Sequence, residues 1–172
     1  MKSMALKFTS IAAASAAMLI ASSCYAAGGL AVSREVTVDN SPATVWKLIG
    51  NFDALDVWHP AVKSSVLKGN GTKVGTTRML TLVGGGDIVE NLTAYSAGKT
   101  GYSYSYGIVK GPLPVKNYLA TISLAPTADG KTLVVWKSTF DAEGAPDDKA
   151  AEIIGGIFDS GLAKVVANFA KQ

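Results

Sequence analysis

The C-terminal stretch of residues 146–169 reads PDDKAAEIIGGIFDSGLAKVVANF, and its large apolar residues recur at intervals of three and four positions. At about 3.6 residues per turn, this spacing places them on one face of an α-helix. The face is formed by Ile154, Phe158, Leu162, Val165 and Phe169. Asp147 or Asp148 is the predicted N-cap of the helix. A long helix with one apolar face needs a sheet to lie on.

The glycines inside this helix are unusual, because each costs roughly 1 kcal/mol relative to alanine in a helix interior. Two interpretations are open for Gly155-Gly156 and Gly161. They admit a ligand or the sheet close to the helix backbone, or the helix is simply flexible.

The central part of the chain predicts the sheet that the helix requires. Seven segments have strand-like composition and are separated by turn residues such as Gly69-Asn70-Gly71 and Asp129-Gly130. They span residues 30–38, 62–68, 76–82, 88–95, 102–109, 118–124 and 132–140. Most connections have hairpin length, which favours an antiparallel meander.

Two short helices are predicted between the first and second strands. Ser41 is the expected N-cap of the first helix, with Pro42 in its first turn, where a missing N–H costs nothing. The second helix, around residues 53–57, should end near His59, because Pro60 disfavours helical geometry at the residue before it.

The N-terminal segment has the features of a secretory signal peptide. Lys2 and Lys7 precede an apolar run over residues 11–21, and small residues follow, with cleavage predicted after Ala26. The run is shorter than the roughly 20 residues that span a bilayer, so a permanent transmembrane anchor is not expected. Cys24 leaves lipoprotein processing open as an alternative. We therefore predict a signal peptide (1–26), one domain (27–172), and a periplasmic or secreted location in a bacterium.

Composition restricts the partners and the chemistry of the mature chain. Removing Lys2 and Lys7 leaves 14 of the 16 basic residues against 13 acidic ones, and no basic cluster remains. Nucleic acid is therefore not an expected partner. With Cys24 removed, the chain has no thiolate, and its single histidine cannot form a typical metal site with carboxylates alone. No cofactor or metal is predicted.

Four segments in this order resemble the START/Bet v1-like (SRPBCC) superfamily. They are Trp58-His59-Pro60-Ala61-Val62, Val89-Glu90-Asn91-Leu92, Gly111-Pro112-Leu113-Pro114-Val115-Lys116-Asn117-Tyr118 and Val134-Val135-Trp136. Within the superfamily the chain is similar to the bacterial polyketide cyclase/dehydrase and MxaD-like group, over residues 30–172. The resemblance implies an α+β helix-grip (Bet v1-like) fold, with a curved seven-stranded antiparallel sheet around a long C-terminal helix.

The resemblance also implies a deep hydrophobic cavity between the sheet and the C-terminal helix. Members of the superfamily bind lipids, sterols, polyketides and plant hormones there, and some catalyse cyclisation, dehydration or condensation. On this basis one set of residues is predicted to line the cavity and bind a ligand. The set is Trp58, His59, Met79, Glu90, Tyr104, Tyr106, Leu113, Tyr118, Ala120, Trp136, Ile154, Phe158 and Leu162.

Hormone-receptor members permit a closer comparison. Their ligand-binding lysine, acidic pocket residue and pocket tyrosine align with His59, Glu90 and Tyr118 of this chain. Their two mobile loops align with Gly84-Gly85-Gly86 and with residues 111–114. Both loops depart from the receptor pattern, with no Ser-Gly-Leu-Pro gate and no His-Arg-Leu latch. Only the cavity position is therefore implied, not hormone perception.

Two ionisable residues are the candidates for chemistry. His59 is a polar group of the cavity, a helix-end residue whose ring donates to a backbone carbonyl, or an acid–base catalyst. Glu90 falls on an apolar strand face with Ile88, Leu92 and Ala94, so it is functional or paired with Arg78 or Lys137; the alternative is a solvent-facing side chain. No catalytic residue is assigned beyond these candidates.

Aromatic residues leave a similar choice open. Tyr102, Tyr104 and Tyr106 alternate with serines and so share one face of a strand. They form a cavity wall with polar tips, or they cover the core, and Trp136 has the same two interpretations.

Three functions follow from these features. The first is a periplasmic or secreted protein that binds a lipid-like, polyketide or aromatic molecule in an apolar cavity. The second is a metal-independent cyclase or dehydratase acting in the same cavity. The third is an accessory protein of a periplasmic oxidation system, where the outer surface would matter.

Overall fold

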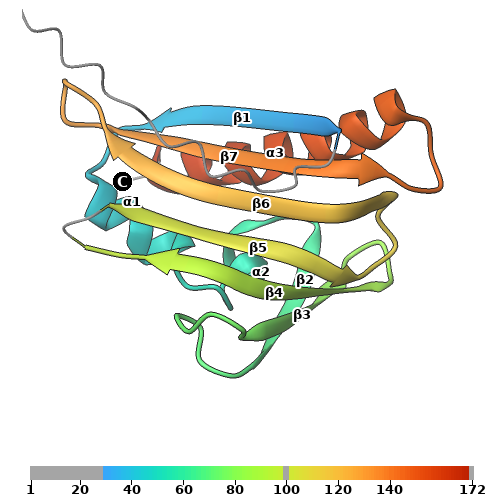
Figure 1. Ribbon diagram of the computed structural model, residues 1–172. Coiled ribbons are helices and arrows are strands. Elements are labelled where there is room, and N and C mark those ends of the chain that lie inside the picture. Colours follow the sequence, from blue (N-terminus) through green and yellow to red (C-terminus); the bar gives the residue numbers. More distant parts are fainter. Residues whose placement is uncertain (1–28, 99–100, 171–172) are drawn as a thin grey trace, which may run out of the picture.

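The computed structural model describes residues 29–98 and 101–170, and there a seven-stranded antiparallel sheet curves around one long helix (Figure 1). The elements are β1 (Leu30–Val38), α1 (Pro42–Ile49), α2 (Leu55–Trp58), β2 (Val62–Lys68), β3 (Thr77–Leu82), β4 (Asp87–Ser96), β5 (Tyr102–Lys110), β6 (Val115–Pro126), β7 (Thr132–Ala142) and α3 (Asp147–Phe169). The strands are ordered β1-β7-β6-β5-β4-β3-β2. This architecture confirms the predicted helix-grip fold. The predicted signal peptide lies outside the described residues.

The two main helices begin differently. At α1 the prediction holds, since the Ser41 hydroxyl accepts a hydrogen bond from the Thr44 amide at 3.3 Å. At α3 the N-cap is Pro146, not an aspartate, and no side chain caps the helix. Asp147 and Asp148 instead occupy the first turn, where their charges still interact favourably with the helix dipole.

Within the described residues, the strand pairing has four register shifts, and two of them change what simple alternation predicts. In β6 the pairing with β7 shifts between Lys116 and Leu119, where Asn117 has a positive φ of 51°. Val115 and Lys116 already pair with β7 before this shift, so the strand begins at Val115, three residues before the predicted start. In β4 the register shifts between Leu92 and Ala94, and Ala94 becomes exposed. The predicted shared face of Glu90 and Ala94 is therefore wrong.

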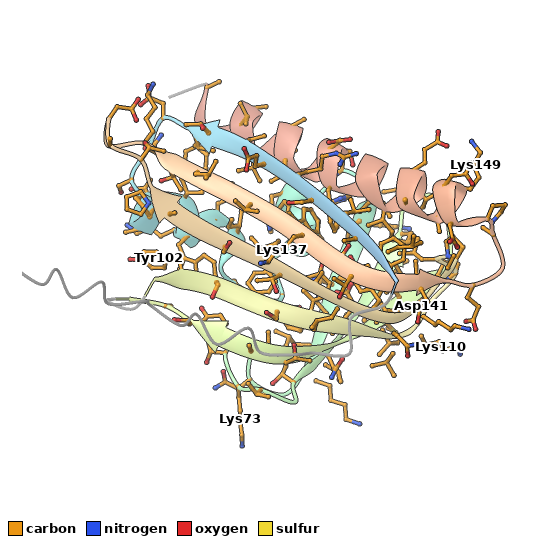
Figure 2. All side chains as sticks on the ribbon, turned by 45° about the horizontal axis from the view of Figure 1, so that its top comes forward. Lys73, Tyr102, Lys110, Lys137, Asp141 and Lys149 are labelled. Atoms are coloured by element: carbon orange, nitrogen blue, oxygen red, sulfur yellow. The ribbon has the colours of Figure 1, made fainter. Side chains whose placement is uncertain are left out.

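The core lies between the inner face of the sheet and the helices. Helix α3 packs against β1 and β7, and α2 packs against β2. At one end of the interior Trp46 of α1 contacts Tyr95, Tyr102 and Tyr104, with ring centroids 5.5–6.0 Å apart. Figure 2 shows Lys137 on the opposite, outer face of the sheet, away from α3. Within the described ranges, no helix has both the length and the apolar character to cross a membrane.

Candidate ligand-binding cavity

A cavity of about 290 Å³ lies between the inner face of the sheet and helices α2 and α3. Its surface is mostly apolar, and the polar side chains in its lining are few. The residues that line it are Leu55, His59, Ala61, Val62, Leu80, Leu82, Gly84, Gly85, Ile88, Glu90, Tyr106, Ile108, Leu113, Tyr118, Trp136, Ile154 and Ile157. The space is near the lower end of the range for small-molecule sites.

The structure brings together part of the predicted site. The predicted residues that line the cavity are His59, Glu90, Tyr106, Leu113, Tyr118, Trp136 and Ile154. They come from the α2–β2 connection, β4, β5, the β5–β6 connection, β6, β7 and α3, so the fold collects them from the length of the chain. Their contact with a ligand stays a prediction.

The other predicted residues lie elsewhere. Buried in the core without lining the cavity are Trp58, Tyr104, Ala120, Phe158 and Leu162. Tyr104 is displaced toward the far end of the interior because it packs between Trp46 and Phe52. Met79 was predicted to line the cavity, but its side chain is 43% exposed on the outer face of the sheet. Its neighbours in β3, Arg78 and Leu80, point inward, and alternate residues of a strand point to opposite faces.

Several lining residues were not predicted, and strand alternation could have found some of them. Leu80 and Leu82 share a face with Arg78, while Ile88 shares a face with Glu90 and Ile108 shares one with Tyr106. Leu55, Ala61, Val62, Gly84, Gly85 and Ile157 depend on how the loops and helices fold back over the sheet. Local sequence carries no comparable signal for them.

A buried ion pair joins β3 and β4 beside the cavity. Arg78 and Glu90 are directly opposite each other in the ladder, and Arg78 Nε donates to Glu90 Oε2 at 2.7 Å. Their side chains are 0% and 6% exposed. Burial raises the pKa of Glu90, and the adjacent guanidinium opposes that rise. The partner that the sequence left open is thus Arg78 and not Lys137.

The remaining contacts of Arg78 hold its guanidinium in place. Nη1 donates to the Phe52 carbonyl oxygen, and the guanidinium carbon lies 4.1 Å from the Phe52 ring centroid and 5.1 Å from that of Tyr106. Nη2 and the Tyr104 hydroxyl are buried and make no hydrogen bond of ordinary geometry within the described residues. Burial raises the pKa of Tyr104, and the charge of Arg78 opposes this rise.

His59 is buried, and the backbone contacts both of its ring nitrogens. Nδ1 accepts from the Ala61 amide at 3.2 Å, so the ring proton is on Nε2, which donates to the Ile157 carbonyl oxygen at 3.0 Å. Burial lowers the pKa of His59, and the positive charge of Arg78 lowers it further. His59 therefore has two of its predicted roles. It lines the cavity, and its ring donates a hydrogen bond to a backbone carbonyl, which connects the end of α2 to α3. In this geometry neither nitrogen is free to act as a base.

Phenol and indole groups form the remaining polar surface of the cavity. The Tyr106 hydroxyl accepts from Trp136 Nε1 at 3.0 Å, and the Tyr106 and Tyr118 ring centroids are 6.2 Å apart. Burial raises the pKa of both tyrosines, and the nearby charge of Glu90 raises it further. Both phenols are therefore protonated at neutral pH and can donate hydrogen bonds.

Two glycines of α3 permit close packing at the sheet. A Cβ at Gly161 would lie 2.6 Å from His59 Cδ2 and 2.8 Å from Trp136 Cζ3. A Cβ at Gly155 would lie 2.6 Å from Arg34 Nη2, whereas nothing lies within 4 Å of one at Gly156. The proposed close approach to the helix backbone is thus seen at Gly155 and Gly161 but not at Gly156.

A second depression, of about 520 Å³, lies mainly on the outer face of the sheet. Serine and threonine side chains and Lys137 are prominent in its lining, together with Leu119. It is larger than the inner cavity but has none of the predicted site residues. No group of three or more His, Cys, Asp or Glu side chains in residues 29–98 and 101–170 is arranged to hold a metal ion.

Comparison with known proteins places this geometry in a family. A family model described as "Polyketide cyclase / dehydrase and lipid transport" matches residues 30–170. The chain belongs to this family. No curated protein sequence matches it significantly.

Solved structures of similar proteins include members of the same fold group. XoxI from Bacillus cereus is 32% identical, with a TM-score of 0.73 over 81% of this chain and 95% of that one. A putative uncharacterized protein from Bacillus thuringiensis is 31% identical, with a TM-score of 0.73 over 82% and 99% of the two chains. A protein from Thermobifida fusca is 28% identical, with a TM-score of 0.71 over 82% and 93%. As a member of the polyketide cyclase/dehydrase and lipid transport family, the chain has its candidate site in the inner cavity.

Proposed function

We propose that this protein binds an apolar small molecule of the lipid, polyketide or aromatic class in the cavity between the sheet and α3. The observation that carries the proposal is a mostly apolar lining on which a few polar groups, Glu90, Tyr106 and Tyr118, converge. This combination is typical of small-molecule sites, because apolar surface supplies affinity and a few polar groups fix orientation. The predicted signal peptide adds the proposal that binding takes place in the periplasm or outside the cell.

A fluorescent probe tests the binding proposal. N-phenyl-1-naphthylamine is uncharged and brightens in apolar surroundings, so the protein should enhance its emission in a saturable way. Ile157→Trp should weaken binding at least about tenfold, because Ile157 lines the cavity and the larger side chain fills it. Ile153→Trp is the matched control, since Ile153 is on the same helix but is 41% exposed and does not line the cavity.

Two outcomes would refute the proposal: no saturable enhancement with the wild-type protein, or equal binding by both tryptophan variants. Native mass spectrometry of freshly purified protein adds an independent check. A co-purified small molecule that Ile157→Trp loses and Ile153→Trp retains would support the same site.

Acid–base catalysis in the same cavity is the second candidate. Glu90 favours it, because burial raises the pKa of this carboxyl and two protonated phenols line the same cavity. Glu90 would take a proton next to a carbonyl, and Tyr106 or Tyr118 would donate a hydrogen bond to the resulting enolate oxygen. Exchange of the α-protons of 2-tetralone in D₂O, followed by NMR, should be faster with wild type than with Glu90→Gln. Equal rates would exclude Glu90 as the base.

A further inference from the structure

One carboxylate oxygen in the cavity lining has no hydrogen-bond partner in the described part of the chain. Glu90 lines the cavity with a side chain that is 6% exposed, and its Oε2 is bonded to Arg78. Its Oε1 has no hydrogen-bond partner among the described residues, and it is not one of the fully buried polar atoms without a partner, so it is accessible from the cavity. An occupant of the cavity that donates a hydrogen bond can therefore pair with this oxygen.

Positive charge is not available to such an occupant. Arg78 is committed to Glu90 and to the Phe52 carbonyl, and it does not itself line the cavity. The lining contains no lysine and no other arginine in the part of the chain that the structure describes. His59 is neutral, with both nitrogens bonded to the backbone. An anionic ligand would therefore meet no cation.

The phenols alone do not decide between ligand types. Tyr106 accepts from Trp136, and Tyr118 lines the same space and shares a hydrogen bond with Tyr106, so the phenol that accepts in this pair keeps its own proton for an acceptor in the cavity. A phenol can donate to a hydroxyl oxygen as well as to a carboxylate. Glu90 makes the difference, because its negative charge repels a ligand carboxylate strongly in a region of low dielectric constant.

We propose that the cavity selects a ligand whose polar group is a neutral hydroxyl, an alcohol or a phenol, and rejects ligands that carry a carboxylate. The hydroxyl donates to Glu90 Oε1 and accepts from Tyr106 or Tyr118. Arg78 is a positioning residue, which holds Oε2 and so leaves Oε1 for the ligand. This inference rests on the proposed function and names its ligand class.

Three probes with the same ring system test the inference by calorimetry at pH 7: naphthalene, 2-naphthol and 2-naphthoate. Wild type should bind naphthol about tenfold more tightly than naphthalene, as expected for a hydrogen bond to a charged group. It should bind naphthoate at least about a hundredfold more weakly than naphthol, because that hydrogen bond is lost and like charges are brought together.

Glu90→Gln should reverse this preference. The amide keeps the shape of the side chain but leaves the Arg78 charge without its counterion, so naphthoate should bind more tightly than naphthol. Glu35→Gln makes the same chemical change at an exposed position of β1 and should behave as wild type. Arg78→Met/Glu90→Gln removes both charges and serves if the single variant does not fold. In this double variant, the preference for naphthol over naphthoate should be about tenfold smaller than in wild type. Some preference should remain, because the naphthoate carboxylate still loses its hydration on entering the cavity.

The outcomes separate the two proposals. Naphthoate binding to wild type as tightly as naphthol, or an unchanged preference in the Glu90 variants, would overturn the inference about the polar group. The proposed function would survive that result, because naphthalene would still bind. If none of the three probes binds wild type, the proposed function fails and this inference fails with it.

Discussion

Replacing Gly161 by alanine should destabilise the protein, whereas the same replacement at Gly156 should stabilise it. Both glycines are inside α3, so both variants gain helix propensity worth about 1 kcal/mol. Their surroundings differ. The new Cβ at Gly161 would lie 2.6 Å from His59 and 2.8 Å from Trp136, while at Gly156 it would meet no atom within 4 Å.

The magnitude depends on whether the two rings can move away from Gly161. His59 is fixed by backbone hydrogen bonds at both nitrogens. Trp136 is stacked on Phe158 with ring centroids 4.3 Å apart, and its Nε1 is bonded to Tyr106. Neither ring can shift without breaking these contacts, so overpacking should cost about 1–3 kcal/mol. The net loss at Gly161 is then up to about 2 kcal/mol, against a gain of about 1 kcal/mol at Gly156.

Urea denaturation followed by far-UV circular dichroism measures both changes, with the slope m checked for constancy. The free energy of unfolding should be lower for Gly161→Ala than for Gly156→Ala by about 1–3 kcal/mol. Equal stability of the two variants would refute the close packing of α3 on His59 and Trp136.

Two further predictions concern buried ionisable groups. Glu90→Gln should lower the free energy of unfolding by about 3–5 kcal/mol, because it leaves a buried charge unpaired, and Arg78→Met/Glu90→Gln should recover most of the loss; a single variant as stable as wild type in urea would contradict this. His59 has a folded-state pKa below its unfolded value, so the unfolded state binds the additional proton as pH falls through about 6.5, and stability should decrease between pH 7 and pH 5. His59→Gln cannot take up this proton and should lose less stability over that interval; an identical decrease in both proteins would argue against a neutral, buried His59.

Much of the fold was predictable because its signals are local. Alternating residues and turn glycines located the seven strands, and the spacing of apolar residues located α3. The errors lie where the backbone departs from regular geometry. The bulge near Asn117 hid the first residues of β6, and the bulge after Leu92 turned Ala94 outward. A single extra residue changes the face of everything beyond it, and sequence patterns rarely mark it.

The site was less predictable than the fold, because in β3 the hydrophobicity of a side chain does not indicate whether it is buried. A methionine was expected in the cavity, yet Met79 faces solvent and the arginine beside it is buried. The cross-strand partner Glu90, the Phe52 carbonyl oxygen and two aromatic rings together make that arrangement favourable. By the same alternation Lys137 must point outward once its neighbour Trp136 is inside. Which face of a strand is buried depends on how the strands pair, and the sequence of one strand alone does not give that pairing.

The role of His59 was beyond sequence reasoning for a different reason. Pro60 explained why α2 ends there, and donation to a carbonyl was one of the alternatives. The carbonyl that accepts from Nε2 belongs to Ile157, 98 positions away in the chain. This carbonyl reaches His59 only because α3 packs against the end of α2. The sequence therefore could not tell whether the ring nitrogens of His59 are free or already hydrogen-bonded.

A methyl-resolved NMR titration with N-phenyl-1-naphthylamine shows directly whether a ligand occupies the inner cavity. The methyl resonances of Leu80, Ile88 and Ile154 should shift, because these side chains line that cavity. Those of Val66, exposed on β2, and Leu119, in the outer depression, should stay in place. Shifts at Leu119 with unmoved resonances at Leu80, Ile88 and Ile154 would contradict the account, since the ligand would then occupy the outer face of the sheet.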